Sequence, residues 1–391
     1  MSPAAIPKFR DSKNDQQREL AMRVLCIGSA MIDIIVIVAS RNIERMTMSN
    51  VTASYLLLEQ GTKVEAESIS THVGGGAVNS AVAMRRLGAE VAVLSKVGDD
   101  TNGRRVMEHL AAEGVDAGFV ACGEGLPTGQ AVMVSSHDRN AAIFVQRGAN
   151  GHLGLQDIRP EMFDGRDLVY VSTLSNQSAE SFPAIVEYGR KANAFVTVNP
   201  GIRQITARTE ALLSSLAGVE LIAVNRLEAS ALVPAVAVRG NRDSARELAG
   251  ISEATDAPPL LHAFLTFGGF EMAFPELVSR LMELTGVRRV LVTDGRAGAC
   301  LADDSGVHFC PHLDIEPQGT AGAGDAFTST LSRFLAAGCP AGEALQAAAV
   351  NAASVVEWSD TQSGLLTSEA LKARTDAVAA RLPIRSWAWA S

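Results

Sequence analysis

Small residues crowd the stretch GTAGAGDAF, residues 319–327, in which the single acid Asp325 opens an apolar run that predicts a helix. Gly322, Ala323 and Gly324 leave their backbone N–H groups unobstructed, and the helix dipole adds to their attraction for an anion. A carboxylate beside a bound phosphate can take a proton from an alcohol, as phosphoryl transfer requires. A helix N-terminus with an acid in its first turn has the same pattern, so the loop alone leaves both interpretations open.

A second glycine loop lies near the N-terminus, in the stretch HVGGGAVNSAVAMRRLG, residues 72–88. Gly75 and Gly76 allow a ligand to approach the backbone closely, because they have no side chain. Asn79 falls in the first turns of the helix that is predicted to follow, and its amide offers both a donor and an acceptor to a hydroxyl group. This loop therefore predicts a site for a polar ligand such as a sugar.

Asp33 is a lone acid in the apolar run AMIDIIVIV and is expected at the end of the first strand. Acids are seldom buried without a partner, and the hydroxyl groups of a sugar would be suitable partners. The alternative is an acid at a strand end that is exposed to water.

Several other chemistries lack their motifs in this chain. There is no GxxxxGK[ST] loop, which excludes a P-loop kinase, and no HExxH or paired Cys/His set that would indicate zinc. The GxSxG turn of serine hydrolases is also missing.

The elements that must position these loops alternate between strands and helices. Near-continuous apolar runs of strand length are typical of strands buried on both faces, and segments with helical spacing lie between them. This alternation predicts an α/β fold with a mostly parallel central sheet flanked by helices. The predicted strands are 22–36, 89–98, 167–174, 194–201, 219–225 and 287–295, and the clearest helices are 77–88, 101–114 and 178–193.

Two intervals, 34–73 and 115–147, break this alternation and are predicted to form a small β-sheet lid. Within the second, residues 129–148 predict a hairpin with its turn at 136–140. The α/β core is predicted from 22–33, 74–114 and 148–380, after a disordered leader at 1–21. The interval 234–286 is predicted to be an insertion of two or three short helices.

The composition is that of an ordinary globular protein, with 47% hydrophobic and 20% charged residues among 391. The net charge of −9 and the absence of a dense Lys/Arg run argue against nucleic acid or an anionic membrane as a partner. The five cysteines form no CxxC pair and the start has no apolar signal segment, so we expect a cytoplasmic protein with reduced thiols.

The motifs GGGAVNSAVAMRRLG, SKVGDDTNG, VNRLEA, VTDGRAGA and GTAGAGDAF follow one another in this order. In this arrangement the chain resembles the ribokinase-like carbohydrate kinases, also called the PfkB family, over residues 22–375. The resemblance implies a ribokinase-like α/β fold with a β-sheet lid, and ATP with Mg²⁺ as phosphoryl donor. It also implies a sugar or nucleoside hydroxyl as acceptor, and a homodimer that pairs through the lid.

The resemblance assigns roles to individual residues. Asp325 matches the catalytic base, with Gly322, Ala323 and Gly324 as its anion hole, and the sugar-contacting positions match Asp33, Gly75, Gly76 and Asn79. The positions that help to place Mg²⁺ and phosphate match Asn225 and Glu228, which could alternatively be a helix cap and a first-turn acid. The nucleotide side matches Thr293, Gly295 and Asn351.

The sequence departs from the family pattern at three places. Gly319 stands where the family usually has an acid near a monovalent-cation site, which leaves potassium activation open. In TVNPGIRQ, residues 197–204, Asn199 and Arg203 are retained but the preceding acid is missing, so we expect phosphate to be handled differently. The region WSDTQSG, residues 358–364, is also unlike the usual adenine region.

Two alternatives to a sugar kinase are kept open. A nucleoside kinase would need lid aromatics for base stacking, and the predicted lid has only Tyr55, Phe119 and Phe144, which favours a sugar. A sugar-binding regulator without catalysis would be expected to lose the base or the anion hole, and Asp325 and its small neighbours are present.

Overall fold

The computed structural model describes residues 22–38, 44–47, 54–57, 61, 63–135, 141–250 and 257–390. The predicted leader at 1–21 and the predicted hairpin turn at 136–140 lie outside this part of the chain.

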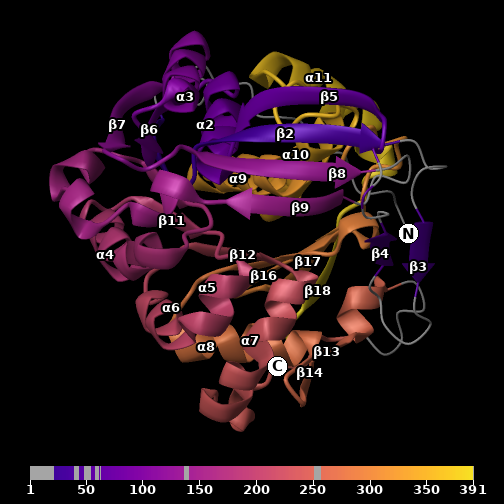
Figure 1. The fold of residues 1–391 in the computed structure, drawn as a ribbon. Helices are drawn as coiled ribbons and strands as arrows, with labels where there is room; N and C mark the ends of the chain where they lie inside the picture. The colour runs from indigo at the N-terminus through magenta and orange to yellow at the C-terminus, as the bar shows by residue number, and fades with distance from the viewer. Residues whose placement is uncertain are drawn as a thin grey trace.

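A ten-stranded sheet forms the centre of the described structure, in the order β18-β17-β16-β15-β12-β11-β10-β1-β6-β7 (Figure 1). Seven of these strands are parallel, which confirms the predicted α/β class, and the last three in the chain are antiparallel. The parallel strands are β1 (Arg23–Ile27), β6 (Glu90–Gly98), β7 (Asp116–Gly123), β10 (Leu168–Val171), β11 (Phe195–Val198), β12 (Leu221–Asn225) and β15 (Val290–Thr293). The antiparallel strands are β16 (Ala299–Asp303), β17 (Gly306–Cys310) and β18 (Arg385–Ala388).

Hydrophobic cores cover both faces of this sheet, because successive side chains of a strand point to opposite faces. In β1, Leu25 and Ile27 belong to one core, and Val24 and Cys26 to the core on the other face. The first face is covered by α4 (Phe182–Lys191), α5 (Ile202–Ala207), α6 (Thr209–Ser215), α7 (Arg226–Arg239) and α8 (Phe274–Thr285). The other helices are α2 (Gly76–Arg86), α3 (Thr101–Ala112), α9 (Ala323–Ala336), α10 (Ala341–Val356) and α11 (Ser368–Val378). None of the described helices is long and apolar enough to cross a membrane.

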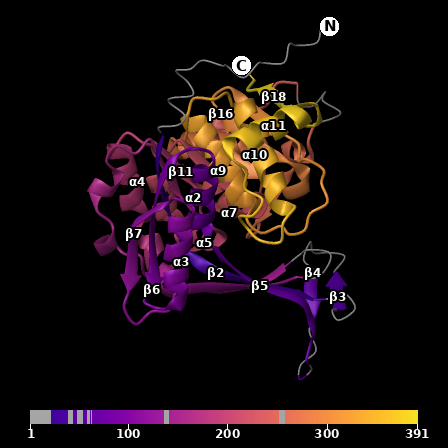
Figure 2. The ribbon, with the colours of Figure 1, turned by 90° about the horizontal axis from the view of Figure 1, so that it is seen from above.

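A smaller four-stranded sheet, in the order β5-β2-β8-β9, lies beside the main one, and a two-stranded ribbon lies at its far end (Figure 2). Its strands are β2 (Met31–Val38), β5 (Ala66–Gly74), β8 (Gly129–Ser135) and β9 (Ala141–Gln146), and the ribbon is formed by β3 (Glu44–Thr47) and β4 (Ser54–Leu57). We refer to β5-β2-β8-β9 as the small sheet. Asp33 lies in β2, not at the end of the first strand as predicted, because β1 ends at Ile27 and the chain then enters the small sheet.

The predicted lid segment 115–147 is divided between the two sheets. Residues 116–123 form β7, which pairs in parallel with β6 and is the edge strand of the main sheet, whereas β8 and β9 belong to the small sheet. As an edge strand, β7 is only partly buried, so its sequence lacks the continuous apolar run of a central strand. It therefore resembles the half-buried strands of the small sheet.

The interval 234–286 contains short helices, as predicted, but also a hairpin and one long helix that were not predicted. Among its described residues the short helices are the 3-10 helices η6 (Arg242–Ser244) and η8 (Pro259–His262). The hairpin pairs β13 (Phe264–Phe267) with β14 (Phe270–Ala273), and the 12-residue helix α8 follows directly. Gly268 and Gly269 form the two-residue turn of the hairpin. Their φ angles are 57° and 82°, which glycine adopts without strain.

Candidate active site

Asp325 lies in the first turn of α9, behind a loop that packs closely on the C-terminal part of the chain. Gly322 caps the helix with a φ of 79°, and a Cβ atom at this position would lie 2.8 Å from the backbone and side chain of Thr361. Only glycine combines this left-handed conformation with so close a neighbour. Burial raises the pKa of Asp325 to about 6, although a hydrogen bond from Asn79 opposes the shift.

Asn79 holds this carboxylate directly. Its side-chain nitrogen Nδ2 donates a hydrogen bond of 2.8 Å to Asp325 Oδ2, and its oxygen accepts from Thr361 Oγ1 at 3.0 Å and from Gln362 Nε2 at 2.8 Å. The predicted substrate residue Asn79 therefore also contacts the predicted base. An amide nitrogen carries two hydrogens, so one remains for another acceptor.

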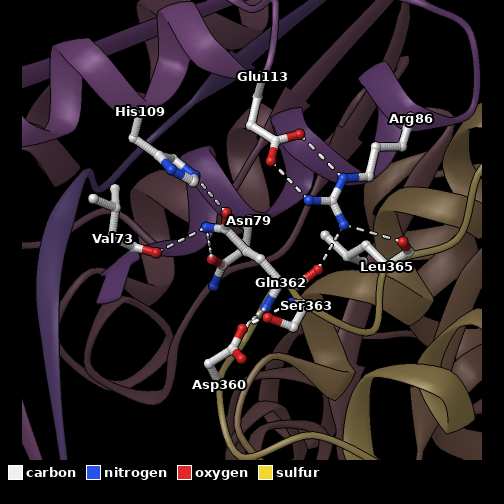
Figure 3. A network of polar contacts seen from close by, with 9 residues as sticks. All are labelled: Val73, Asn79, Arg86, His109, Glu113, Asp360, Gln362, Ser363 and Leu365. Atoms are coloured by element: carbon white, nitrogen blue, oxygen red, sulfur yellow. Dashed lines mark hydrogen bonds and ion pairs between the residues drawn. The ribbon is translucent and has the colours of Figure 1, made fainter. Parts of the chain in front are cut away.

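Gln362 anchors this arrangement, as Figure 3 shows. Its side-chain nitrogen also donates to the carbonyl of Val73 at 3.0 Å, and its oxygen lies 2.7 Å from His109 Nε2. The backbone nitrogen of Gln362 donates to Asp360 at 2.8 Å, and the backbone carbonyl of Gln362 accepts from Arg86 at 2.8 Å. The segment WSDTQSG, which the sequence analysis recorded only as a departure, thus supplies the partners that orient Asn79.

Asp33 is the second carboxyl group near Asp325. It is 4% exposed, and burial together with the nearby charge of Asp325 raises its pKa to about 7. Gly74 makes room for it, because a Cβ atom at Gly74 would lie 1.9 Å from Asp33 Oδ2. Two carboxyl groups that both titrate near neutral pH are typical of a functional site.

The glycine loop at the start of α2 lies between these two acids. Gly75 has a φ of 98° and would place a Cβ atom 2.5 Å from the carbonyl oxygen of Ser29. A Cβ atom at Gly76 would lie 2.9 Å from the side chain of Ser172 and 3.6 Å from Asp325 Oδ1. The backbone nitrogen of Gly76 donates to Ser29 Oγ at 3.0 Å. Glycine is therefore required here by the close packing of this loop on Ser29 and Ser172, beside the predicted base.

A pocket of about 310 Å³ opens on the other side of Asp325. Thr293 and Gly295 at the end of β15 line it, as do Ala323 and Gly324, which precede Asp325 directly. Further lining residues come from the loop 310–320 and from one face of α10, namely Ala349, Ala352, Ala353 and Val356. Its small apolar residues leave room for a flat ring, and its glycines allow close approach of phosphate groups.

Asn351 does not line this pocket, although it was predicted on the nucleotide side. It is fully buried, its amide nitrogen donates to Thr330 Oγ1 at 2.8 Å, and its oxygen accepts from the backbone nitrogen of Leu366 at 3.0 Å. Helical geometry explains the difference, because Asn351 follows Ala349 by two residues and so lies about 160° from it around the helix axis, on the face opposite the pocket.

Asn225 and Glu228 form a capping box at the start of α7. Asn225 Oδ1 accepts from the backbone nitrogen of Glu228, and Glu228 Oε2 accepts from the backbone nitrogen of Asn225, both at 2.9 Å. Asn225 also pairs with Thr293 across β12 and β15, which places the box beside this pocket. Burial raises the pKa of Glu228.

These residues fit a Mg²⁺ ion that is held mainly by phosphates and water. Glu228 provides a hard carboxylate oxygen and Asn225 an amide, which are ligand types that Mg²⁺ accepts. Within the described ranges no three His, Cys, Asp or Glu side chains gather as a metal cage. Such a cage is not needed for Mg²⁺ that arrives with a nucleotide.

Curated relatives of this chain are sugar kinases. Deoxyribokinase of Salmonella typhimurium is 24% identical over 343 residues, which cover 88% of this chain and 95% of the relative. Ribokinase of Bacillus subtilis is 25% identical over 326 residues, which cover 81% and 87%.

Solved structures share the fold at low sequence identity. Ribokinase of Arabidopsis thaliana, complexed with ribose and ATP, superposes with a TM-score of 0.65 at 19% identity, covering 90% of this chain and 98% of that structure. A nucleoside kinase of Burkholderia thailandensis in complex with inosine superposes with a TM-score of 0.66 at 18% identity, covering 92% and 100%. The predicted ribokinase-like fold is thus confirmed.

A family model confirms the resemblance seen in the motifs. The model of the pfkB family carbohydrate kinases matches residues 21–254 and 270–368, most of the chain. The chain therefore belongs to the pfkB family of carbohydrate kinases, phosphotransferases that act on an alcohol group.

Proposed function

We propose that this kinase transfers the γ-phosphoryl group of ATP to a hydroxyl of a sugar, with Asp325 as the general base. The observation that carries the proposal is the position of Asp325. Ala323 and Gly324, which precede Asp325, line the pocket that we assign to the nucleotide. Asp325 Oδ1 lies near Gly76, on the side of Asp33. A base at this junction can contact the acceptor hydroxyl while the phosphate lies against the N-terminus of α9.

In the proposed reaction the acceptor hydroxyl loses its proton to Asp325 as its oxygen attacks the γ-phosphorus. The new O–P bond forms while the bond from the γ-phosphorus to the bridging oxygen breaks, and ADP leaves. Backbone N–H groups of Gly322, Ala323 and Gly324 stabilise the charge on the transferred group. When bound, Mg²⁺ near Glu228 and Asn225 neutralises phosphate charge. A base pKa of about 6 suits proton transfer near neutral pH.

The acceptor is assigned to the side of Asp33 and the glycine loop. Asp33 accepts or donates hydrogen bonds to sugar hydroxyls according to its protonation, and the second amide hydrogen of Asn79 adds a donor. The small sheet contributes Asp33 through β2 and would exclude water if it closes over the acceptor.

A sugar is favoured over a nucleoside because the small sheet offers few aromatic rings for a base. Phe119 lies in β7 of the main sheet, packs on the core and has the Arg166 guanidinium 5.6 Å from its ring centre. Phe144 of β9 is 63% exposed, and the side chain of Tyr55 lies outside the described structure. Base stacking needs such rings, whereas a sugar needs hydrogen-bonding groups.

The test is a nucleotide-consumption assay with pentoses, hexoses, sugar phosphates and nucleosides as acceptors. Asp325→Asn is expected to lower kcat by about 10²- to 10⁴-fold while the acceptor still binds, as for a lost general base. Wild-type turnover in Asp325→Asn would contradict the role of Asp325. Folded wild-type protein that binds sugars but turns over none of them would instead favour a non-catalytic sugar-binding regulator.

A further inference from the structure

Two arginine-bearing loops converge on the acceptor side of the site. Arg147 follows β9 and precedes the 3-10 helix η2 (Gly148–His152), and Arg203 is the second residue of α5. Both loops pack against the segment 172–176 that follows β10. A Cβ atom at Gly201 would lie 2.6 Å from the side chain of Thr173, and one at Gly151 would lie 2.9 Å from Asn176 Nδ2.

The same segment contacts the glycine loop beside the base, since a Cβ atom at Gly76 would lie 2.9 Å from Ser172. The backbone of Arg147 also packs against the small sheet near Asp33. A Cβ atom at Gly129 of β8 would lie 2.9 Å from the carbonyl oxygen of Arg147, and Gly129 pairs with Met31, two residues before Asp33 in β2. The two arginines therefore belong to the acceptor side and not to the nucleotide pocket.

The loops of both arginines pack on the same segment, 172–176, and the charge of Arg203 acts on Arg147. Burial and, after it, the nearby charge of Arg203 lower the pKa of Arg147, which is half-buried, whereas Arg203 is exposed. Among the described residues, neither guanidinium has a carboxylate within ion-pair distance. Like charges side by side without a counter-ion are unfavourable.

Arg147 differs in this respect from other arginines that the described structure buries at least in part. Those arginines contact a carboxylate, a carbonyl oxygen or an aromatic face; they are Arg86, Arg166, Arg208, Arg280, Arg289, Arg333, Arg374 and Arg385. A partly buried guanidinium without such a partner is costly to keep. Arg147 is the exception, and it lies on the acceptor side of the site, where a bound ligand can supply the missing negative charge.

We propose that Arg147 and Arg203 bind an anionic group of the acceptor, so that this kinase phosphorylates a sugar that already carries a phosphate monoester or a carboxylate. A guanidinium is suited to this task because its planar donors match both groups in a bidentate manner. A neutral sugar would leave both charges unpaired. The inference rests on the proposed function and specifies its substrate class.

The experiment compares matched acceptors in the nucleotide-consumption assay. Ribose is paired with ribose 5-phosphate, fructose with fructose 6-phosphate, and glucose with gluconate, so that phosphate and carboxylate are distinguished. We expect at least one anionic acceptor to exceed its neutral partner in kcat/KM by about 10- to 100-fold, the factor for hydrogen bonds to a charged group. Arg147→Met and Arg203→Gln are each expected to remove most of this preference by raising the KM for the anionic acceptor.

Controls separate this inference from the proposed function. Arg159→Gln, which alters an exposed arginine before η4 (Pro160–Phe163), is expected to change neither the preference for anionic acceptors nor the kcat/KM for neutral ones. Turnover of neutral sugars only, unaffected by Arg147→Met, would overturn the anionic class but leave the kinase intact. A rise in the KM for ATP with every acceptor in Arg203→Gln would overturn its assignment to the acceptor.

Discussion

The side-chain amide of Asn79 donates a hydrogen bond of 2.8 Å to Asp325. This bond joins the two glycine loops, whose bonded residues are 246 positions apart in sequence. The orientation of the amide is determined by its other end, because Asn79 Oδ1 accepts from both Thr361 and Gln362. The nitrogen must then face the carboxylate. In this way the C-terminal segment, through Asn79, positions the group that we propose as the base.

Replacement of Asn79 is expected to shift the pH dependence of the reaction. The hydrogen bond from Asn79 lowers the pKa of Asp325 against the effect of burial, so Asn79→Leu raises that pKa above about 6. The active form is the carboxylate, and the acidic limb of the kcat/KM profile should therefore move to higher pH, by on the order of one unit. The measurement is a profile from pH 5 to pH 9.

Gln362→Leu provides the second arm of this test. It leaves Asn79 in place but removes one of the two donors that orient its amide, so we expect a smaller shift in the same direction. Arg374→Gln, which alters an ion pair with Glu357 outside this network, should leave the profile unchanged. An unshifted acidic limb in Asn79→Leu would contradict the role of Asn79 in setting the pKa of Asp325.

Asp33 is expected to lower the free energy of unfolding at high pH, because its carboxyl group is buried in the site. Its pKa is about 7 in the folded protein, above the usual value of 3.8, so its contribution to stability is fully present below pH 4 and is lost as the pH rises through 7. Asp33→Asn removes the titration. Relative to wild type, its free energy of unfolding should increase by about 1–3 kcal/mol between pH 5 and pH 8.

Denaturant unfolding at both pH values checks this prediction, and Asp376→Asn on the exposed face of α11 serves as the control. The same Asp33→Asn variant should have a raised KM for the acceptor, because stabilising a site of this kind commonly costs function. A pH-independent difference in unfolding free energy would show that Asp33 does not titrate as described.

The sequence predicted those site residues whose environment is local. Gly322 and Asp325 lie in one helix turn, and Gly75, Gly76 and Asn79 in another, so their loops could be identified without the fold. Gln362 could not, because its contact with Asn79 spans 283 residues and only folding brings them together. The edge strand β7 was assigned to the lid for a related reason, since half-buried strands look alike in either sheet.

The two sides of α10 are expected to respond differently to mutation. Ala352→Leu adds volume to the wall of the nucleotide pocket and should raise the KM for ATP about tenfold or more, with little change in stability. Asn351→Ala leaves Thr330 and the backbone nitrogen of Leu366 without a buried partner, and should lower the free energy of unfolding by about 1–3 kcal/mol. Its KM for ATP should not change. A raised KM for ATP in Asn351→Ala would contradict this and would indicate that Asn351 contributes to nucleotide binding.

Gly319 stands where the family usually has an acid, and its surroundings explain the difference. A Cβ atom there would lie 2.9 Å from the carbonyl oxygen of Trp358 and 3.1 Å from that of Ser359, so the two backbones pack too closely for a side chain. Gly319→Asp is therefore expected to displace the segment 358–364 that orients Asn79. We expect a lower Tm and a lower kcat at every potassium concentration. Gly319→Ala separates size from charge and should share the loss of Tm, because the clash begins at Cβ. Potassium activation that appears in Gly319→Asp without a loss of Tm would show that the acid fits and that its absence is not enforced by packing.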